Sequence, residues 1–168
     1  MKITANEEYG LRIILRVAKI RVADDSKLVS LNEVSEAEGI SVENTAAILS
    51  KLREAGLIES VRGKYGGYKL GKELEEINLH EVMSAVSKDT FNLDFCDTHT
   101  GNQETCVHTE DCSVRSVWSN LTNLINNFFA SITLKHLLED EAKAGIDIQG
   151  SFSILQEFTE NNLTGANK

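Results

Sequence analysis

The three cysteines of this 168-residue chain are its most chemically distinctive residues, and they lie close together in the sequence. Cys96, Cys106 and Cys112 all fall within the stretch FCDTHTGNQETCVHTEDCSVRSVW. Thiolates are preferred ligands of soft metal centres, so three of them in one polar segment favour an iron–sulfur cluster, either 2Fe–2S or 4Fe–4S. A peroxide-sensing thiol switch, with one cysteine attacking and another resolving, is the first alternative.

Zinc is the second alternative for the cysteine segment. Structural zinc sites use a closed set of four ligands, commonly in CxxC pairs, and the chain contains no such pair. Any metal centre here needs a fourth ligand beside the three thiolates. His99 and His108 lie within the segment and are candidates, although a loop histidine is often simply solvated.

The distribution of charge and of apolar residues indicates which partners and which cellular location to expect. Residues 1–72 carry 12 Lys and Arg against 10 Asp and Glu, whereas residues 73–168 carry 5 against 16. A locally basic region on an acidic protein can dock on phosphates while the rest suppresses non-specific binding. No stretch approaches the roughly 18 to 20 apolar residues of a membrane span, and charged residues interrupt the N-terminal apolar positions. We therefore expect a cytoplasmic protein, in which thiols stay reduced.

Three helices are expected to position a DNA-binding surface near the N-terminus. A capping box of Thr4 and Glu7 opens a helix over residues 5–22, and a second box of Ser30 and Glu33 opens a helix that ends at Gly39. Ser41 can cap a third helix that ends near residue 56. Two short helices about a glycine turn are typical of a helix-turn-helix, although an ordinary helical hairpin has the same pattern.

The next segment, LIESVRGKYGGYKL, predicts a β-hairpin with a glycine-rich tip. A hairpin directly after a recognition helix is typical of a wing whose cations reach phosphate or the minor groove. Asparagine can contact adenine and glutamate can accept from cytosine in the major groove. The predicted DNA contacts are the early helix positions and the wing, with one lysine further along the helix: Ser41, Glu43, Asn44, Thr45, Lys51, Arg62, Lys64 and Tyr65.

Helical periodicity returns after the cysteine segment. Apolar residues recur at three- and four-residue intervals from Val114 to Leu138, which predicts about 26 residues of helix and favours dimerisation through an apolar stripe. The expected organisation is a mainly α protein. It comprises a winged helix-turn-helix domain (1–88), a cysteine-rich loop (89–112), a dimerisation helix (113–144) and a tail (145–168) in which one short helix is expected around residues 153–159.

These motifs resemble the IscR/NsrR family of bacterial winged-helix regulators, also called the Rrf-two family. The resemblance rests on the start MKIT…Y, the block GISVENTAAILSKLREAGLIESVRGKYGGYKL, the three cysteines, and SVRSVW…NNFFASITL, together covering about residues 1–138. It implies a homodimer whose long helix crosses to the other subunit. It also implies binding to palindromic double-stranded promoter DNA, with an iron–sulfur cluster in the loop of many members.

The resemblance also suggests a fourth ligand. In the nitric-oxide-sensing and redox-sensing branches, a helix-1 carboxylate ligates the cluster across the dimer, and Glu8 occupies this place here. In the cluster-assembly branch a histidine three residues after the last cysteine is the ligand, but this chain has Arg115 there. The wing has Lys64 and Tyr65 where proline is usual, and the nine residues between Cys96 and Cys106 exceed the common spacing.

The sequence therefore predicts a non-enzymatic transcription regulator whose promoter binding is set by a cluster that senses redox state, nitric oxide or iron status. A cysteine-thiol switch without a cluster is the alternative within the same class. An iron–sulfur electron carrier is less favoured, because no acid–base pair or substrate-pocket signature is evident. A regulator acting through a protein partner, with incidental cysteines, is a further alternative.

Overall fold

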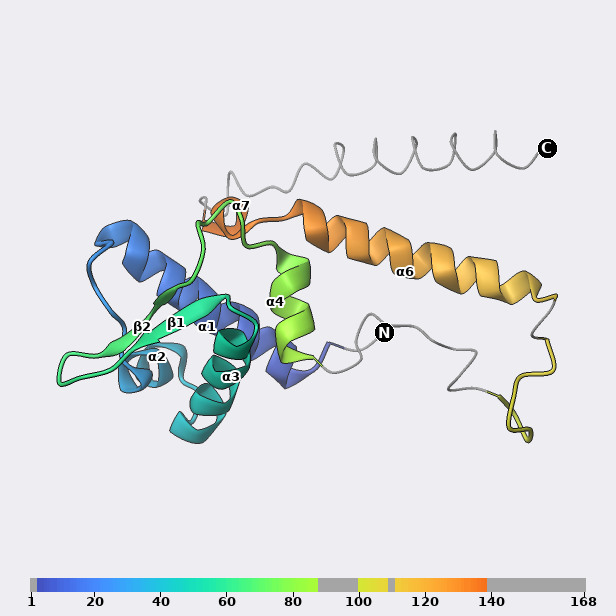
Figure 1. The fold of residues 1–168 in the computed structure, drawn as a ribbon, viewed down its shortest axis with the longest axis horizontal. Helices are drawn as coiled ribbons and strands as arrows, with labels where there is room; N and C mark the ends of the chain where they lie inside the picture. The colour runs from blue at the N-terminus through green and yellow to red at the C-terminus, as the bar shows by residue number, and fades with distance from the viewer. Residues whose placement is uncertain (1–2, 88–99, 109–110, 139–168) are drawn as a thin grey trace.

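The computed structural model describes residues 3–87, 100–108 and 111–138. Cys96, His99 and the short helix expected after residue 145 lie outside these ranges. The predicted mainly helical, winged-helix architecture is confirmed (Figure 1). No helix in the described ranges is both long and apolar enough to cross a membrane. The elements in chain order are α1 (Ala5–Ala23), α2 (Leu31–Glu38), α3 (Val42–Glu54), β1 (Ile58–Val61), β2 (Gly67–Leu70), α4 (Leu79–Val86), α6 (Ser113–Ser131) and α7 (Leu134–Leu138).

Capping boxes determine where three of the helices begin. The two boxes predicted from sequence are confirmed: the Thr4 amide donates to Glu7 at 2.6 Å, and the Ser30 amide donates to Glu33 at 2.8 Å. A third box joins Asn78 and Glu81 at the start of α4. In each box the glutamate satisfies an amide that has no partner within its helix.

The turn between α2 and α3 is a tight helix-turn-helix connection. Gly39 ends α2 in the left-handed region, with φ of 65°, which is a conformation that glycine adopts without strain. Ile40 is buried in the angle between the two helices, and the Ser35 hydroxyl donates to its carbonyl at 2.6 Å. Ser41 then caps α3 by accepting from the Asn44 amide. The predicted helix-turn-helix is confirmed.

The wing is a two-stranded antiparallel hairpin. Ile58 pairs with Leu70 and Val61 with Gly67, and an isolated bridge between Val29 and Tyr68 adds a third chain segment to its side. This bridge joins the segment before α2 to the wing. A Cβ atom at Gly66 would collide with the Val61 carbonyl oxygen, so the turn needs glycine there.

The buried core lies where α1, α3 and α4 meet the base of the hairpin. Ile13 and Ile14 of α1, Leu49 and Leu52 of α3, and Val82 of α4 are all fully buried. These residues recur at helical spacing, so each helix presents one apolar face to its neighbours. The core therefore fixes α3 against α1 and α4 and leaves its opposite face free.

The long C-terminal helix is interrupted, and the expectation of one continuous helix to residue 138 is wrong. Helix α6 ends at Ser131, and Ile132 adopts an extended conformation. The Ile132 carbonyl accepts from the Leu79 amide at 2.7 Å, and the Leu134 amide donates to the Ile77 carbonyl at 2.9 Å. This pairing with the segment before α4 replaces the helical hydrogen bonds and separates α7 from α6.

Candidate DNA interface and cysteine segment

The exposed face of α3 carries most of the residues expected to read DNA. Ser41, Glu43 and Asn44 are exposed at its N-terminal end, as the sequence indicated. Ala47 is exposed one turn after Glu43 and was not predicted as a contact. A helical projection of the buried residues would have found it, because Ala47 lies opposite that stripe. The alanine methyl group is of a kind that can make apolar contact with the methyl group of thymine.

Thr45 is a correction to the predicted contacts. Its side chain is fully buried, and Oγ1 has no hydrogen-bond partner within the described residues. The reason is helical spacing: Thr45 lies three and four residues before Ile48 and Leu49, which are both in the core. The expectation that Thr45 is exposed to DNA is therefore wrong.

Lys51 does not extend freely into solvent. Its Nζ donates to the carbonyl oxygen of Val86, the last residue of α4, at 3.0 Å. The side chain is half-buried, and its ammonium group lies at the C-terminal end of α4 rather than at an open surface. The phosphate contact predicted for Lys51 is thus replaced in this structure by a bond between α3 and α4.

The wing tip presents an exposed cationic and aromatic surface. Arg62, Lys64 and Tyr65 are all exposed, and the Tyr65 side chain is 85% accessible. Lys64 Nζ lies 5.6 Å from the centre of the Tyr65 ring. Within the described residues neither Arg62 nor Lys64 forms an ion pair, so both charges remain available to phosphate.

Ion pairs join the helix-turn-helix to α1, because two arginines of α1 share one carboxylate at the end of α2. Glu38 at the end of α2 accepts from Arg12 at 3.2 Å and from Arg16 at 2.7 Å. A side-chain nitrogen of Arg12 also donates to the Glu38 carbonyl. No local pattern in the sequence marks this contact, because its partners are more than twenty residues apart.

Two of the three cysteines fall in the described residues. Cys106 and Cys112 are unbonded thiols of intermediate exposure, and Cys112 is the N-cap residue of α6. The guanidinium of Arg115 donates to the carbonyl of His108 at 2.9 Å. This bond connects α6 to the segment between the two cysteines. The His108 side chain itself is exposed.

The donor set of three thiolates and a carboxylate suits an iron–sulfur cluster in its chemistry. Within the described ranges no three His, Cys, Asp or Glu side chains form a group that could hold a metal ion. Glu8 is exposed on α1. Figure 1 shows α6 projecting from the domain, with the end that Cys112 caps farthest from α1.

Helix α6 carries an apolar stripe along its projecting part. Its C-terminal end packs on α4, where Phe128 and Phe129 contact the cluster of Leu79, Met83 and Ile132. Toward the other end, large apolar side chains are 39% to 59% exposed. They share one face at three- and four-residue spacing and are Val114, Val117, Trp118, Leu121 and Leu124.

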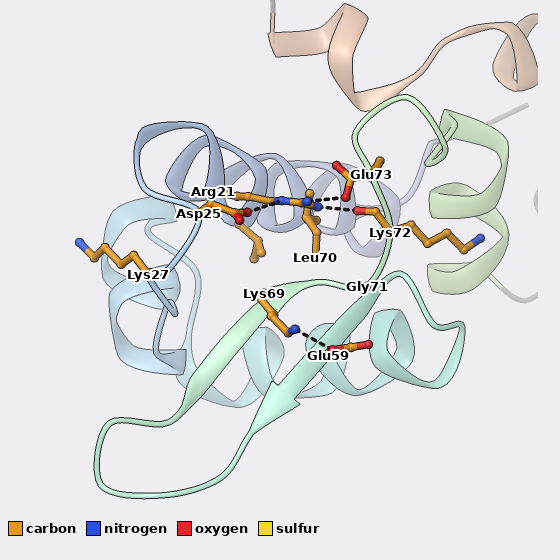
Figure 2. Close-up of a pocket in the computed structure, with 10 residues that line it drawn as sticks. Arg21, Asp25, Lys27, Glu59, Lys69, Leu70, Gly71, Lys72 and Glu73 are labelled. Atoms are coloured by element: carbon orange, nitrogen blue, oxygen red, sulfur yellow. Dashed lines mark hydrogen bonds and ion pairs between the residues drawn. The ribbon is translucent and has the colours of Figure 1, made fainter.

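A polar hollow of about 250 Å³ lies between the C-terminal end of α1 and the base of the hairpin (Figure 2). Arg21 bridges Asp25 at 2.9 Å and Glu73 at 2.7 Å, and donates to the Lys72 carbonyl. Lys69 pairs with Glu59 at 3.1 Å. Most of the charges lining the hollow therefore pair with one another, and Arg21 joins α1 to the segment that follows β2.

Comparison with known proteins places these features in a wider group. Residues 3–140 match the Rrf2 family model, described as an iron-dependent transcriptional regulator. The chain is 34% identical over 140 residues to the HTH-type transcriptional regulator IscR of Vibrio atlanticus, covering 83% of this chain and 76% of that protein.

Solved structures agree with this match. T. potens IscR superposes with a TM-score of 0.64 at 28% identity, covering 84% of this chain and 90% of that one. CymR, the global cysteine regulator of B. subtilis, superposes with a TM-score of 0.61 at 26% identity, covering 82% and 95%.

Proposed function

This chain belongs to the Rrf2 family of transcriptional regulators, and we propose that it binds palindromic double-stranded DNA as a homodimer under the control of an iron–sulfur cluster. Glu43, Asn44 and Ala47 on α3 face the major groove. Arg62, Lys64 and Tyr65 on the wing contact the backbone or minor groove. The protein acts in the cytoplasm, where its thiols stay reduced.

The observation that carries the proposal is the separation of Cys112 from α1 along the projecting α6. A second copy that covers the exposed stripe on α6 brings its own α1 toward these cysteines. Cys96, Cys106 and Cys112 then supply three thiolates, and Glu8 of the second copy supplies a carboxylate. The cluster would provide a centre that reacts with oxidants or nitric oxide.

Regulation follows from the nature of the fourth ligand. A carboxylate binds iron more weakly than thiolate does and exchanges more readily. Loss of the bond to Glu8 removes a restraint on the N-terminal turn of α1, and α1 contacts the helix-turn-helix through Arg12, Arg16 and Glu38. The cluster thus biases the position of α3 on DNA.

Anaerobic purification tests the cluster directly. Visible absorption with iron and acid-labile sulfide in equal amounts is expected, and the iron content per chain distinguishes the two-iron from the four-iron form. Gel filtration of the same sample should give a dimer. A colourless protein that cannot be reconstituted with iron and sulfide would contradict the proposal.

A thiol switch is the second candidate function. It is favoured by Cys106 and Cys112, which are unbonded and partly accessible, and by the fold shared with CymR. In this case peroxide would change DNA affinity in iron-free protein, and a reductant would reverse the change. A cluster-based regulator would show no such reversible response after its iron is removed.

A further inference from the structure

Val86, the last residue of α4, is held from two sides by the DNA-binding domain. Its carbonyl oxygen accepts from Lys51 Nζ on α3 at 3.0 Å. Its side chain is 2% exposed and packs on Gly10 of α1. A Cβ atom at position 10 would lie 2.6 Å from Val86 Cγ1, so α1 and α4 approach as closely as a glycine allows. A displacement of Val86 must therefore disturb α1, α3 or both.

Val86 also stands where the chain leaves the winged-helix domain. Ser87 caps α4 by donating its amide to Met83, and the cysteine-rich loop follows within two residues. On α1, Glu8 precedes Gly10 by two residues. Glu8 thus lies on the helix that Val86 packs against, and the cysteine-rich part of the sequence follows Val86 along the chain.

The bond from Lys51 is of a strong type. Its donor is charged, which makes such hydrogen bonds shorter and stronger than neutral ones. Its acceptor is among the last carbonyls of α4, where the helix dipole favours a cation. Because Lys51 is half-buried, breaking the bond also leaves its ammonium group without this partner in a partly shielded position. The bond therefore resists separate movement of α3 and α4.

We propose that Lys51 is a positioning residue that couples the cysteine segment to the recognition helix through the Val86 carbonyl. This inference rests on the proposed function, because it describes how the state of the cluster reaches α3. A change in the cysteine segment shifts the last turn of α4. Lys51 then either draws α3 with it or releases its bond, and both events change how α3 is presented to DNA.

Two lysine variants separate coupling from simple phosphate binding. Lys51→Met keeps the apolar stem and removes the donor. Lys64→Met, at the wing tip, removes a cation that has no bond to α4. Each variant and the wild-type protein are titrated, with and without the cluster, against a duplex that the wild-type protein selects from a random-sequence library. The readout is the ratio of the two dissociation constants.

The expected ratios differ between the two variants. The wild-type protein should show a ratio of about 5 to 150, the usual range for coupling between two sites. Lys64→Met should weaken both affinities and leave the ratio unchanged. Lys51→Met should reduce the ratio to below about 2. A Lys51→Met protein with the wild-type ratio overturns the coupling but leaves cluster control intact, whereas a wild-type ratio of one overturns the proposed function.

Hydrogen exchange provides a test that needs no variant. The amides of Ile48 to Leu52 on α3 should change their protection when the cluster is removed from the wild-type protein. Unchanged protection in α3, together with a change in DNA affinity, overturns the route through Lys51. Lys51→Arg keeps a donor of similar reach and should retain the wild-type ratio; its loss in a folded Lys51→Arg protein also counts against the proposal.

Discussion

Arg16 Nε lies 2.7 Å from Oε1 of Glu38, which joins the middle of α1 to the last residue of α2. Arg12 shares the same carboxylate, and the Glu38 side chain is only 13% exposed. Gly39 follows Glu38 directly, so the pair fixes the chain at the turn that sets α3. Helix α1 is thus a structural support of the recognition helix as well as the element that carries Glu8.

Glu38→Gln should lower the free energy of unfolding by about 1 to 3 kcal/mol, because hydrogen bonds to charged groups contribute about this amount in partly buried sites. Urea unfolding measures the change. Glu59→Gln is a matched control, since it removes an ion pair whose Lys69 and Glu59 side chains are 46% and 58% exposed. The control should cost less than about 1 kcal/mol. Equal losses in the two variants would contradict the role of Glu38.

Gly10→Ala should destabilise the protein although alanine favours helices. The new methyl would lie 2.6 Å from Val86 Cγ1, and overpacking of this kind costs about 1 to 3 kcal/mol. Thermal unfolding measures the loss. In a Val86→Ala background the same substitution should lose most of its cost, because the clashing methyl groups are gone. An unchanged cost in that background would place the strain elsewhere.

Glu81 links stability to acid pH. Burial alone would raise the pKa of Glu81, but its hydrogen bonds with Lys72, at 2.7 Å, and with the Asn78 amide outweigh burial and hold the pKa below its usual value. A lowered pKa stabilises the folded state above about pH 4.3, the unfolded value. This stabilisation disappears as pH falls through the folded-state pKa.

Glu81→Gln should therefore melt below the wild-type protein at neutral pH, since glutamine can keep the capping bond but loses the charge. Once Glu81 is protonated in the wild-type protein, the two melting temperatures should converge. Melting curves recorded across the acid range check this. A difference that persists well below the folded-state pKa would mean that shape, rather than charge, distinguishes the two side chains.

The stripe on α6 predicts the oligomeric state. Leu121 is 39% exposed and lies in the middle of the stripe. Leu121→Glu should convert the dimer to a monomer, because a buried unpaired carboxylate is costly at an apolar interface. Analytical ultracentrifugation measures the mass. Asn123 is exposed on α6 outside the stripe, so Asn123→Glu adds the same charge there and should remain dimeric. A dimeric Leu121→Glu protein would place the interface on another surface.

The fourth ligand can be identified by comparing two substitutions. Glu8→Gln should give a cluster with an altered visible spectrum and faster loss in air, because the amide is a poorer iron ligand than the carboxylate. His108→Ala should leave both properties unchanged. The opposite result for Glu8 and His108 would assign the ligand to the cysteine segment itself.

Cys106→Ala tests the cluster itself and should lose the cluster and the regulatory response, while the winged-helix domain stays folded.

Local signals made much of the fold predictable. The boxes at Thr4 and Ser30, the glycine at position 39 and the alternation around the hairpin each determine a short stretch by contacts between near neighbours. Helix starts and the wing could therefore be placed from sequence alone. The burial of Thr45 was also within reach, because its spacing to Ile48 and Leu49 predicts it.

Contacts between distant segments were not predictable in this way. Lys51 reads as an exposed cation in the sequence, and only the arrival of α4 gives its ammonium a partner 35 residues away. The break at Ile132 has the same cause, since that residue pairs with the chain before α4. Neither the type of a residue nor its spacing in the sequence indicates which distant segment will pack against it.

The pairing of Ile77 and Leu79 with Leu134 and Ile132 closes the chain on itself at the edge of the winged-helix domain. The chain between these two points comprises α4, which belongs to the core, then the cysteine segment and α6, and it returns to the place where it began. Closing such a loop becomes only about 0.6 kcal/mol harder each time its length doubles. The cysteine segment can therefore gain or lose residues at little thermodynamic cost. The cysteine segment could therefore change in length and composition during evolution while the winged-helix domain stays the same.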